Sequence, residues 1–353
     1  MEVTVQTKLL QKAMARLQRI CERHKLYIEA VDSQLVLKGE DNLLLCECRL
    51  PADVLTAGVF STGWLGFLSL YPGRSTHLIT CDQEQCLTLR SGSVSFTRLR
   101  TGSHSYPTIP KMKPVAEFGA DLITALKKLK PFFVNRAFYP TLRLEGGRGE
   151  FTLMVTTQNL TYGWVKGVSG PEHRVKIEIP LELAIELIDA KPSRVLLLKG
   201  GKHIGASFGG VLIAKLAAIN EQGSFHDPPQ DLKTIASVWF DPEPLIKICR
   251  QAMKEPLIGS MVKRSNSPTF ELSFKNGFAR FCFTDDEGEI EMRGVSYAGE
   301  LPSSVSLEPD PHILNRFLSN CESDLIRLDF LQHGKDDYLG LSDCSGYDYR
   351  FPY

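Results

Sequence analysis

Basic residues near the start of the chain recur at the spacing of one helical face. Steps of three or four residues place them within an arc of roughly 80° on an α-helix. They are Lys8, Lys12, Arg16, Arg19 and Arg23. An apolar stripe runs beside them, formed by Leu10, Ala13, Leu17, Ile20 and Cys21. Such a helix buries its stripe and presents cations that can bind phosphate groups without reading a base sequence.

Two further predicted helices carry the same theme. One begins near Gly119 and bears Lys127, Lys128 and Lys130, and the other begins near Asp241 and bears Lys247, Arg250 and Lys254. A single basic helix face is usually only a solvated surface, but recurrence on three helices favours a role toward phosphates. The 41 basic residues equal the 41 acidic ones, so the chain has no bulk basic field. Motifs for base readout are absent from the sequence.

The elements that position these helices repeat at about one third of the 353 residues. First helices are expected near Thr7, Gly119 and Asp241, and second helices near Ser61, Pro180 and Pro309. Runs flanked by turn residues predict antiparallel strands at Gln34–Leu37, Leu43–Arg49, Cys86–Leu89, Val94–Leu99, Leu196–Leu198, His203–Phe208, Phe270–Phe274, Ala279–Phe283, Leu325–Phe330 and Tyr338–Ser342. This repeat predicts an α+β fold of three domains, 1–114, 115–231 and 232–353, each with two helices packed on antiparallel sheets.

Several other classes of site are disfavoured by the sequence. It contains no phosphate-binding glycine loop, nucleophile elbow or zinc-protease motif. The acidic run at 285–291 lacks the ligand spacing of a calcium loop, and the nine cysteines lack metal-binding spacing. No apolar run reaches the roughly 18 residues of a membrane helix. We therefore expect a cytoplasmic protein that is not an enzyme and binds no membrane, metal or cofactor, with an unrecognised hydrolase as the least favoured alternative.

The order of motifs resembles the bacterial DNA polymerase III β sliding clamp family along essentially the whole chain. Leu87–Phe96, followed by Ser105–Pro110, is similar to the closing hairpin and Phe/Tyr-Pro of the first clamp domain. Val155–Tyr162 stands where clamps carry a V-A-T-D-x-x-R-L-like segment. Phe225–Pro228 resembles the clamp F-P-D-Y motif, and Tyr349–Tyr353 resembles the clamp tail.

The resemblance implies a processivity factor of DNA replication. Two three-domain subunits would close head-to-tail into a homodimer ring, with the basic helices facing duplex DNA in a sequence-independent manner. DNA polymerase and clamp loader would bind through short peptides in a hydrophobic pocket. The resemblance carries that pocket to Thr157, Asn159, Leu160, Thr161, Tyr162, His226, Tyr349, Phe351, Pro352 and Tyr353. It also places Phe96, Leu257 and Ile258 at subunit contacts, although each could equally belong to a core.

The chain departs from the family pattern at the implied pocket. Residues 158–162 lack the usual basic residue, His226 replaces a proline, and the tail stops soon after Pro352. The pocket is therefore expected to be present but altered, as in a clamp encoded by a phage or another mobile element. Two alternatives stay open. Phe351–Tyr353 could be a strand that only covers the core, and the whole chain could be a clamp-fold scaffold or decoy that binds clamp-binding peptides without encircling DNA.

Overall fold

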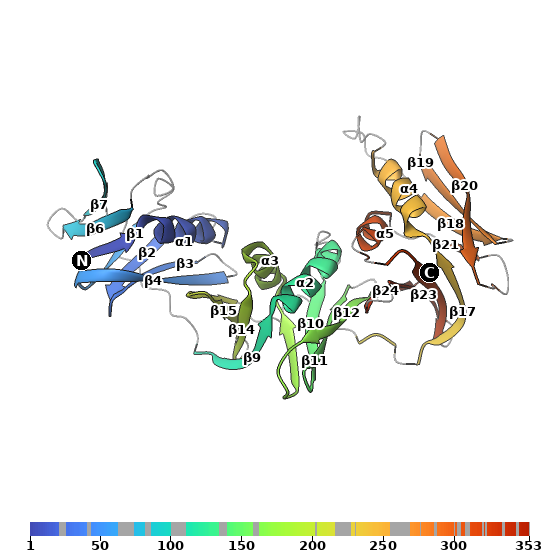
Figure 1. Ribbon diagram of the computed structural model, residues 1–353, viewed down its shortest axis with the longest axis horizontal. Helices are drawn as coiled ribbons and strands as arrows, with labels where there is room; N and C mark the ends of the chain where they lie inside the picture. Colours follow the sequence, from blue (N-terminus) through green and yellow to red (C-terminus); the bar gives the residue numbers. More distant parts are fainter. Residues whose placement is uncertain are drawn as a thin grey trace. The chain divides into compact units, whose positions relative to one another are not determined.

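The computed structural model divides into two compact units (Figure 1). The first comprises Met1–Ile123 and Ile179–Glu221, and the second comprises Thr124–Glu178 and Gln222–Tyr353. The structure describes residues 1–20, 26–40, 44–62, 74–81, 86–99, 111–133, 140–157, 162–201, 203–215, 227–229, 231–254, 269–275, 277–285, 288–299, 301, 305–307, 311–319, 321, 323–333, 336–343 and 346–352.

The described part of the first unit is built on a 12-stranded antiparallel sheet. Its main path is β8-β7-β6-β1-β4-β16-β15-β14-β9, while β2 pairs with β3 and β5, and β3 pairs with β4. The strands are β1 (Glu2–Gln6), β2 (Leu26–Val31), β3 (Gln34–Glu40), β4 (Leu44–Thr56), β5 (Gly58–Thr62), β6 (Ser75–Cys81), β7 (Cys86–Ser91), β8 (Val94–Leu99), β9 (Lys113–Gly119), β14 (Arg194–Gly200), β15 (His203–Phe208) and β16 (Val211–Lys215).

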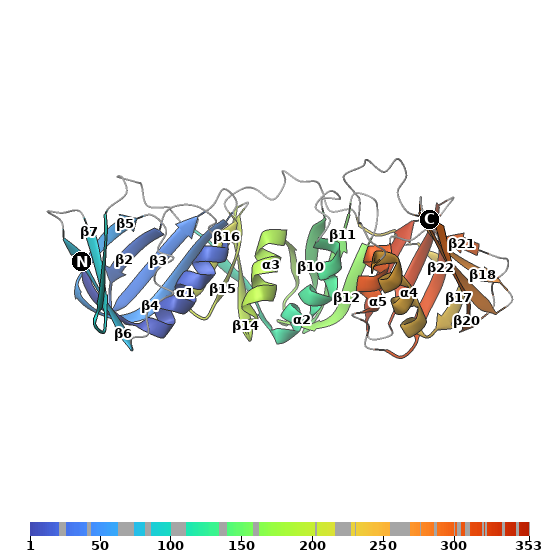
Figure 2. The same ribbon diagram turned by 90° about the horizontal axis from the view of Figure 1, so that it is seen from above.

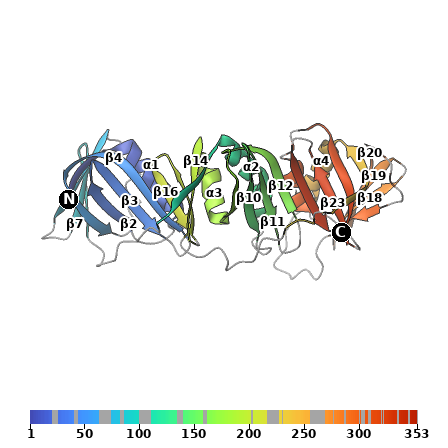
Figure 3. The same cartoon turned by 90° about the horizontal axis from the view of Figure 1, so that it is seen from below.

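Two helices accompany this first sheet, α1 (Thr7–Ile20) and α3 (Leu181–Ala190). The apolar stripe of α1 is buried, with Leu10 and Leu17 at most 1% exposed, and α1 packs on β3 and β4. Strand β4 also lies beside β16 (Figures 2 and 3) and pairs with it, with Val211 opposite Cys48. The sheet therefore continues from the first predicted domain into the second without a break.

The described part of the second unit also holds a 12-stranded sheet. Its order is β13-β10-β11-β12-β24-β23-β22-β17-β20-β19-β18-β21. The strands are β10 (Thr141–Gly147), β11 (Glu150–Thr156), β12 (Tyr162–Ser169), β13 (Val175–Ile179), β17 (Lys233–Phe240), β18 (Thr269–Lys275), β19 (Phe278–Asp285), β20 (Gly288–Ala298), β21 (Val305–Leu307), β22 (Ile326–His333), β23 (Asp336–Ser342) and β24 (Tyr347–Pro352).

Helices α4 (Pro242–Lys254) and α5 (Pro311–Leu318) pack against each other in this second unit. Helix α2 (Ala120–Leu129) ends there and continues as the short 3₁₀ helix η2 (Lys130–Phe133). The last strand is anchored in the core, because the Tyr347 ring centroid lies 4.5 Å from that of Phe317 on α5. The Tyr347 hydroxyl also donates a 2.7 Å hydrogen bond to the Lys128 carbonyl.

Most of the predicted elements are confirmed. Strand β8 has the predicted bounds, and α1, α2 and α4 begin within one residue of the predicted positions. The Asp241 carboxylate caps α4 by accepting the Glu243 N–H at 2.8 Å, with Pro242 in the first helical position. The turn at Gly92 closes the β7–β8 hairpin with φ +59°, a conformation that glycine adopts without strain. Cys46, Cys48 and Cys86 are buried, and none of the three forms a disulfide.

The predicted helix start near Ser61 stays a prediction, because Ser61 pairs with Tyr27 in β5 and residues 63–73, which follow this strand, lie outside the described part. The end of one predicted strand is wrong. Strand β4 does not end near Arg49 but runs through Pro51 to Thr56, since its later residues pair with β1. Helix α2 ends at Leu129, directly before Lys130 and Pro131, and the short 3₁₀ helix η2 follows it to Phe133. The boundaries of the three domains stay a prediction.

Candidate nucleic-acid and peptide interfaces

Helix α1 presents the basic face that its spacing predicts. Lys8 and Lys12 are exposed, whereas Arg16 is half-buried. The Arg16 guanidinium carbon lies 5.1 Å from the centre of the Phe208 ring, which belongs to β15. The side chain of Arg19 and all of Arg23 lie outside the described part. The cations of α1 therefore have two settings, an exposed one and one against an aromatic ring.

The basic residues of α2 and η2 differ in exposure, although their spacing predicts one exposed face. Lys127 and Lys130 are exposed. Lys128 is half-buried, and its ammonium lies 5.9 Å from the centre of the Tyr347 ring. Because the Lys128 carbonyl also accepts the Tyr347 hydroxyl, this residue helps to hold the last strand in place.

The basic face of α4 is partly neutralised within the helix. Lys247 and Arg250 are exposed, and the side chain of Lys254 lies outside the described part. The Lys247 ammonium lies 3.5 Å from the Glu243 carboxylate one turn earlier. An exposed pair of this kind contributes little to stability, but it reduces the charge that Lys247 presents to a phosphate. On helix α1, by contrast, Lys8, Lys12 and Arg16 make no salt bridge within the described part of the chain.

The described residues of the implied peptide pocket are buried, but they do not share one surface. Tyr162 lies opposite Arg350 in the β12–β24 ladder, while Tyr349 lies opposite Gly163. Because directly opposed residues point to the same side of a sheet, Tyr162 and Tyr349 face opposite sides. Tyr349 is 2% exposed and packs on Phe132 of η2, with ring centroids 5.4 Å apart. Tyr349 thus fits the core alternative rather than a pocket shared with Tyr162.

Tyr162 belongs to an apolar cluster on the other side of this sheet. The cluster contains Tyr162, Trp164, Leu331 and Tyr338, with the partly buried Met154 and Leu232 packed against it. Burial raises the pKa of Tyr162, with smaller contributions from Tyr338 and Asp227, so its hydroxyl stays protonated at neutral pH. Sequence motifs point to Tyr162 alone among these residues, because Leu331 and Tyr338 come from β22 and β23 near the other end of the chain. The alternation along β12 does pair Tyr162 with Trp164 on one face.

The remaining predicted pocket residues are only partly visible. Thr157 is 5% exposed and directly follows β11. Phe351 lies opposite Leu339 and Pro352 opposite Tyr338 in the β23–β24 ladder, while their side chains are outside the described part. Five predicted residues lie wholly outside it, namely Asn159, Leu160, Thr161, His226 and Tyr353.

The predicted subunit contact on β8 is exposed in the described structure. Phe96 is 41% exposed, and its neighbours Val94 and Leu99 are 40% and 69% exposed. Strand β8 ends the described path of the first sheet, so this apolar strand lies at an edge. Long apolar edge strands promote association with another strand. Leu257 and Ile258, the other predicted contacts, lie outside the described part.

The described residues offer neither a metal site nor a membrane-spanning helix. No group of three or more His, Cys, Asp or Glu side chains there could hold a metal ion. None of the helices in that part is long and apolar enough to cross a membrane.

Solved structures match this chain along its full length. The DNA polymerase sliding clamp of Bacillus subtilis superposes with a TM-score of 0.80 at 16% identity, covering 100% of this chain and 99% of the clamp. The Pseudomonas aeruginosa clamp bound to griselimycin gives 0.78 at 16% identity, and the Thermotoga maritima β subunit gives 0.77 at 15%, both with the same coverage. No protein-family model and no curated protein matches the sequence.

These comparisons establish the fold. The chain has the fold of DNA polymerase III β sliding clamps along its whole length, as the sequence motifs predict. At 14–16% identity to such clamps, it is a divergent version of that fold.

Proposed function

We propose that this chain is a DNA sliding clamp, a non-enzymatic processivity factor that encircles duplex DNA as a head-to-tail homodimer. The observation that carries the proposal is the full-length match to sliding clamps, at a TM-score of 0.80. The cations of α1 support it, because Lys8 and Lys12 are exposed and can attract phosphates without fixing a base sequence. Encirclement would then supply the retention that weak, screened attraction cannot.

Ring closure would use the exposed apolar edge of the first unit. Phe96 and its neighbours on β8 form a strand edge that a second copy could extend, and the heterologous contact would repeat once to close a two-subunit ring. The solution mass would then be twice the 39.4 kDa of one chain.

Partner proteins would dock on the apolar cluster around Tyr162. Trp164 and Tyr338 are buried in that cluster, at 6% and 4% exposure, so a peptide would meet it at its rim, where Met154 and Leu232 are only partly buried. One matching clamp was solved bound to griselimycin, which gives that protein a ligand site. We assign polymerase and clamp-loader peptides to the cluster of this chain, where Pro352 lies opposite Tyr338 in the β23–β24 ladder.

The second candidate is a clamp-fold scaffold or decoy that binds such peptides without encircling DNA. The observation that favours it is the departure of residues 158–162 and the tail from the clamp pattern. A decoy has no need for basic helix faces, so the effect of those faces on DNA retention separates the two candidates.

Charge reversal on the helices tests the proposed function. The variant Lys12→Glu, Arg16→Glu, Lys247→Glu is expected to lose retention on nicked circular DNA while it keeps its fold. A matched control reverses three exposed strand lysines, Lys113, Lys199 and Lys233, and is expected to stay on the DNA. Equal retention of the two variants would contradict the assignment and favour the scaffold.

A further inference from the structure

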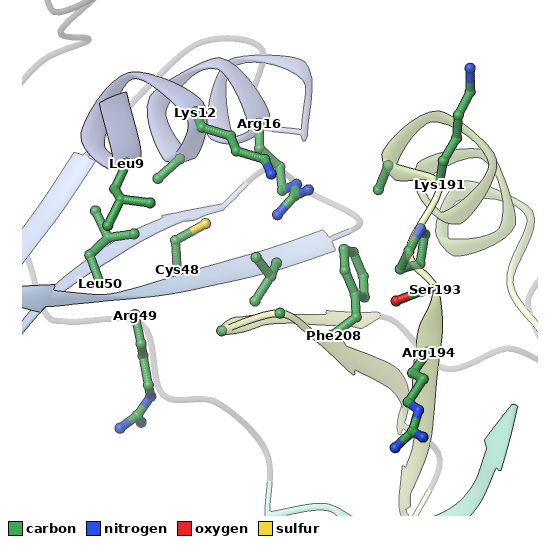
Figure 4. Close-up of a pocket in the computed structure, with 16 residues that line it drawn as sticks. Leu9, Lys12, Arg16, Cys48, Arg49, Leu50, Lys191, Ser193, Arg194 and Phe208 are labelled. Carbon is green, nitrogen blue, oxygen red and sulfur yellow. The ribbon is translucent and has the colours of Figure 1, made fainter. Parts of the chain in front are cut away.

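A cleft of about 330 Å³ opens within the first unit beside α1. Four segments line it: one face of α1, the middle of β4, the α3–β14 turn at 190–194 and the β15–β16 hairpin at 208–211 (Figure 4). Its floor is continuous sheet, because Val211 of β16 lies opposite Cys48 of β4. The size is that of a small-molecule site, and the walls belong to paired strands and helix ends.

The lining of this cleft is strongly basic. Five of its 16 residues are Lys or Arg, and none is Asp or Glu. Arg49 and Arg194 have carboxylate partners beyond the lining, at 2.6 Å from Glu47 and 3.7 Å from Glu117. Within the described structure, Lys12 and Arg16 make no salt bridge. The cleft therefore concentrates positive charge that the described protein does not neutralise.

Three basic residues of the lining make no salt bridge within the described structure, and two of them, Lys12 and Arg16, enter the cleft, while Lys191 points away from it (Figure 4). Lys12 and Arg16 extend from α1 into the space above Phe208, and the Ser193 hydroxyl turns toward the same space (Figure 4). Arg49 and Arg194 point away from it (Figure 4). A lysine, an arginine and a hydroxyl thus converge on one volume from two separate segments of the chain.

The guanidinium of Arg16 packs on an aromatic ring, and one of its N–H donors has no acceptor in the described structure. Its carbon lies 5.1 Å from the centre of the Phe208 ring, a cation–π contact. Its Nε atom is buried and has no hydrogen-bond partner in the described structure. Because guanidinium donors lie in the plane of the group, stacking on a ring leaves them available to an acceptor at the edge. Because the Nε atom is itself not accessible to solvent, a bound oxyanion would accept from the terminal N–H groups of the guanidinium.

The backbone of both walls is fixed before any ligand arrives. The Arg49 N–H donates to the Gly210 carbonyl at 2.8 Å, which pins the hairpin that carries Phe208. The Lys191 N–H donates to the Leu187 carbonyl at 3.1 Å, which closes the end of α3 just before Ser193. Such a preformed site loses little conformational entropy when it binds.

We propose that this cleft is a binding site for a phosphate group, held by Arg16, Lys12 and Ser193. Phosphate suits the three donors better than a carboxylate does, because its tetrahedral oxygens can accept from several directions at once. The phosphate comes either from the backbone of duplex DNA or from a small phosphate compound. The site itself rests on the cleft geometry, and only the DNA source rests on the proposed function.

The site is tested with inorganic phosphate. Phosphate replaces chloride at constant ionic strength, and the thermal unfolding midpoint of the full chain is measured at each phosphate concentration. A specific site gives a saturable rise of the unfolding midpoint. Arg16→Gln is expected to raise the half-saturating phosphate concentration about tenfold or more, as for the loss of one charged hydrogen bond. Lys12→Gln, on an exposed position, serves as a second variant. Arg194→Gln is the matched control, since it removes the same charge from a side chain that points away.

Binding of a linear duplex to the same variants identifies the source of the phosphate. If DNA supplies it, Arg16→Gln weakens duplex binding several-fold more than Arg194→Gln. If a small compound supplies it, the two variants weaken duplex binding equally while their phosphate responses still differ. The proposal is overturned if phosphate gives no saturable response, or if both Arg16→Gln and Lys12→Gln respond as Arg194→Gln does. A chain that fails to encircle DNA would keep the inorganic phosphate response, so the two proposals fail separately.

Discussion

Two clefts of this molecule carry several basic residues, but only one of the clefts also holds the carboxylates that neutralise them. In the first unit, Lys12 and Arg16 enter a cleft whose lining contains no acid. In the second unit, a cleft of about 220 Å³ lies over β12, β24, β23 and β22. There Arg327 donates from Nε to the Asp329 carboxylate at 2.9 Å, and the Lys166 ammonium lies 3.5 Å from Asp348.

The second cleft is therefore a completed network. Asp329 also accepts the Ser237 hydroxyl at 2.6 Å, and Arg350 stacks 4.3 Å from the centre of the Trp164 ring. Burial lowers the pKa of Arg350, while Asp348 and Asp329 oppose that shift. Donors that already have acceptors hold strands together, whereas donors without acceptors are available to a ligand. A cluster of positive charge is therefore not by itself a sign of a binding site.

The largest expected effect is loss of the network in the second cleft. Asp329→Ala removes the buried acceptor shared by Ser237 and the partly exposed Arg327, so the free energy of unfolding should fall by about 1–3 kcal/mol. Denaturant unfolding measures this loss, and duplex binding should not change. A loss under about 0.5 kcal/mol would mean that the second cleft does not depend on its ion pairs.

The salt dependence of duplex binding separates the two clefts next. Arg16→Gln should reduce the slope of log affinity against log salt by about 1, because one phosphate contact is lost. Arg327→Gln should leave that slope unchanged, since Asp329 already occupies its guanidinium. Equal slopes for the two variants would remove the functional distinction between the clefts.

Stability in chloride should respond little to loss of the Arg16 charge. Arg16→Met keeps much of the packing on Phe208 but removes an unneutralised cation. We expect the free energy of unfolding to change by no more than about 1 kcal/mol, in either direction. Denaturant unfolding in chloride is the measurement. A loss of several kcal/mol would show that Arg16 is structural, like the residues of the second cleft.

The smallest expected effect is a change in the pKa of the Cys48 thiol, which lines the first cleft. The hydrogen bond from Cys46 lowers its pKa most, burial opposes this, and Arg16 lowers the pKa further. Arg16→Gln should therefore raise the pKa of Cys48, by less than Cys46→Ala does. Thiolate absorbance against pH, with Cys48→Ala as the blank, measures both shifts. An unchanged pKa in Arg16→Gln would place the guanidinium farther from the thiol than the structure does.

Local patterns in the sequence were enough to predict the helices and hairpins. The helix cap at Asp241 and the turn at Gly92 involve residues that are close in sequence, so neither depends on contacts with distant segments of the chain. The sites are different, because their parts come from distant strands. Trp164 donates to Asp348, which lies 184 residues further along, and Arg16 meets Phe208 only because β16 pairs with β4.

The altered pocket illustrates the same limit. Spacing along β24 cannot reveal that Tyr349 faces Phe132 while Tyr162 faces the opposite side of the sheet. That assignment needs the register of the β12–β24 ladder, which is set by packing across the whole second unit. A pattern shared with a family can thus place a segment correctly and still leave the direction of a side chain undetermined.

The most direct test of the account is retention on nicked circular DNA before and after the circle is cut. The protein is first loaded, with loading confirmed by a loader-dependent signal, and then washed at moderate salt. If the chain encircles DNA, we expect it to stay on the closed circle and to leave once a double-strand cut creates an end. Equal loss from the circle and from the cut DNA would contradict encirclement and leave the clamp fold as a peptide-binding scaffold.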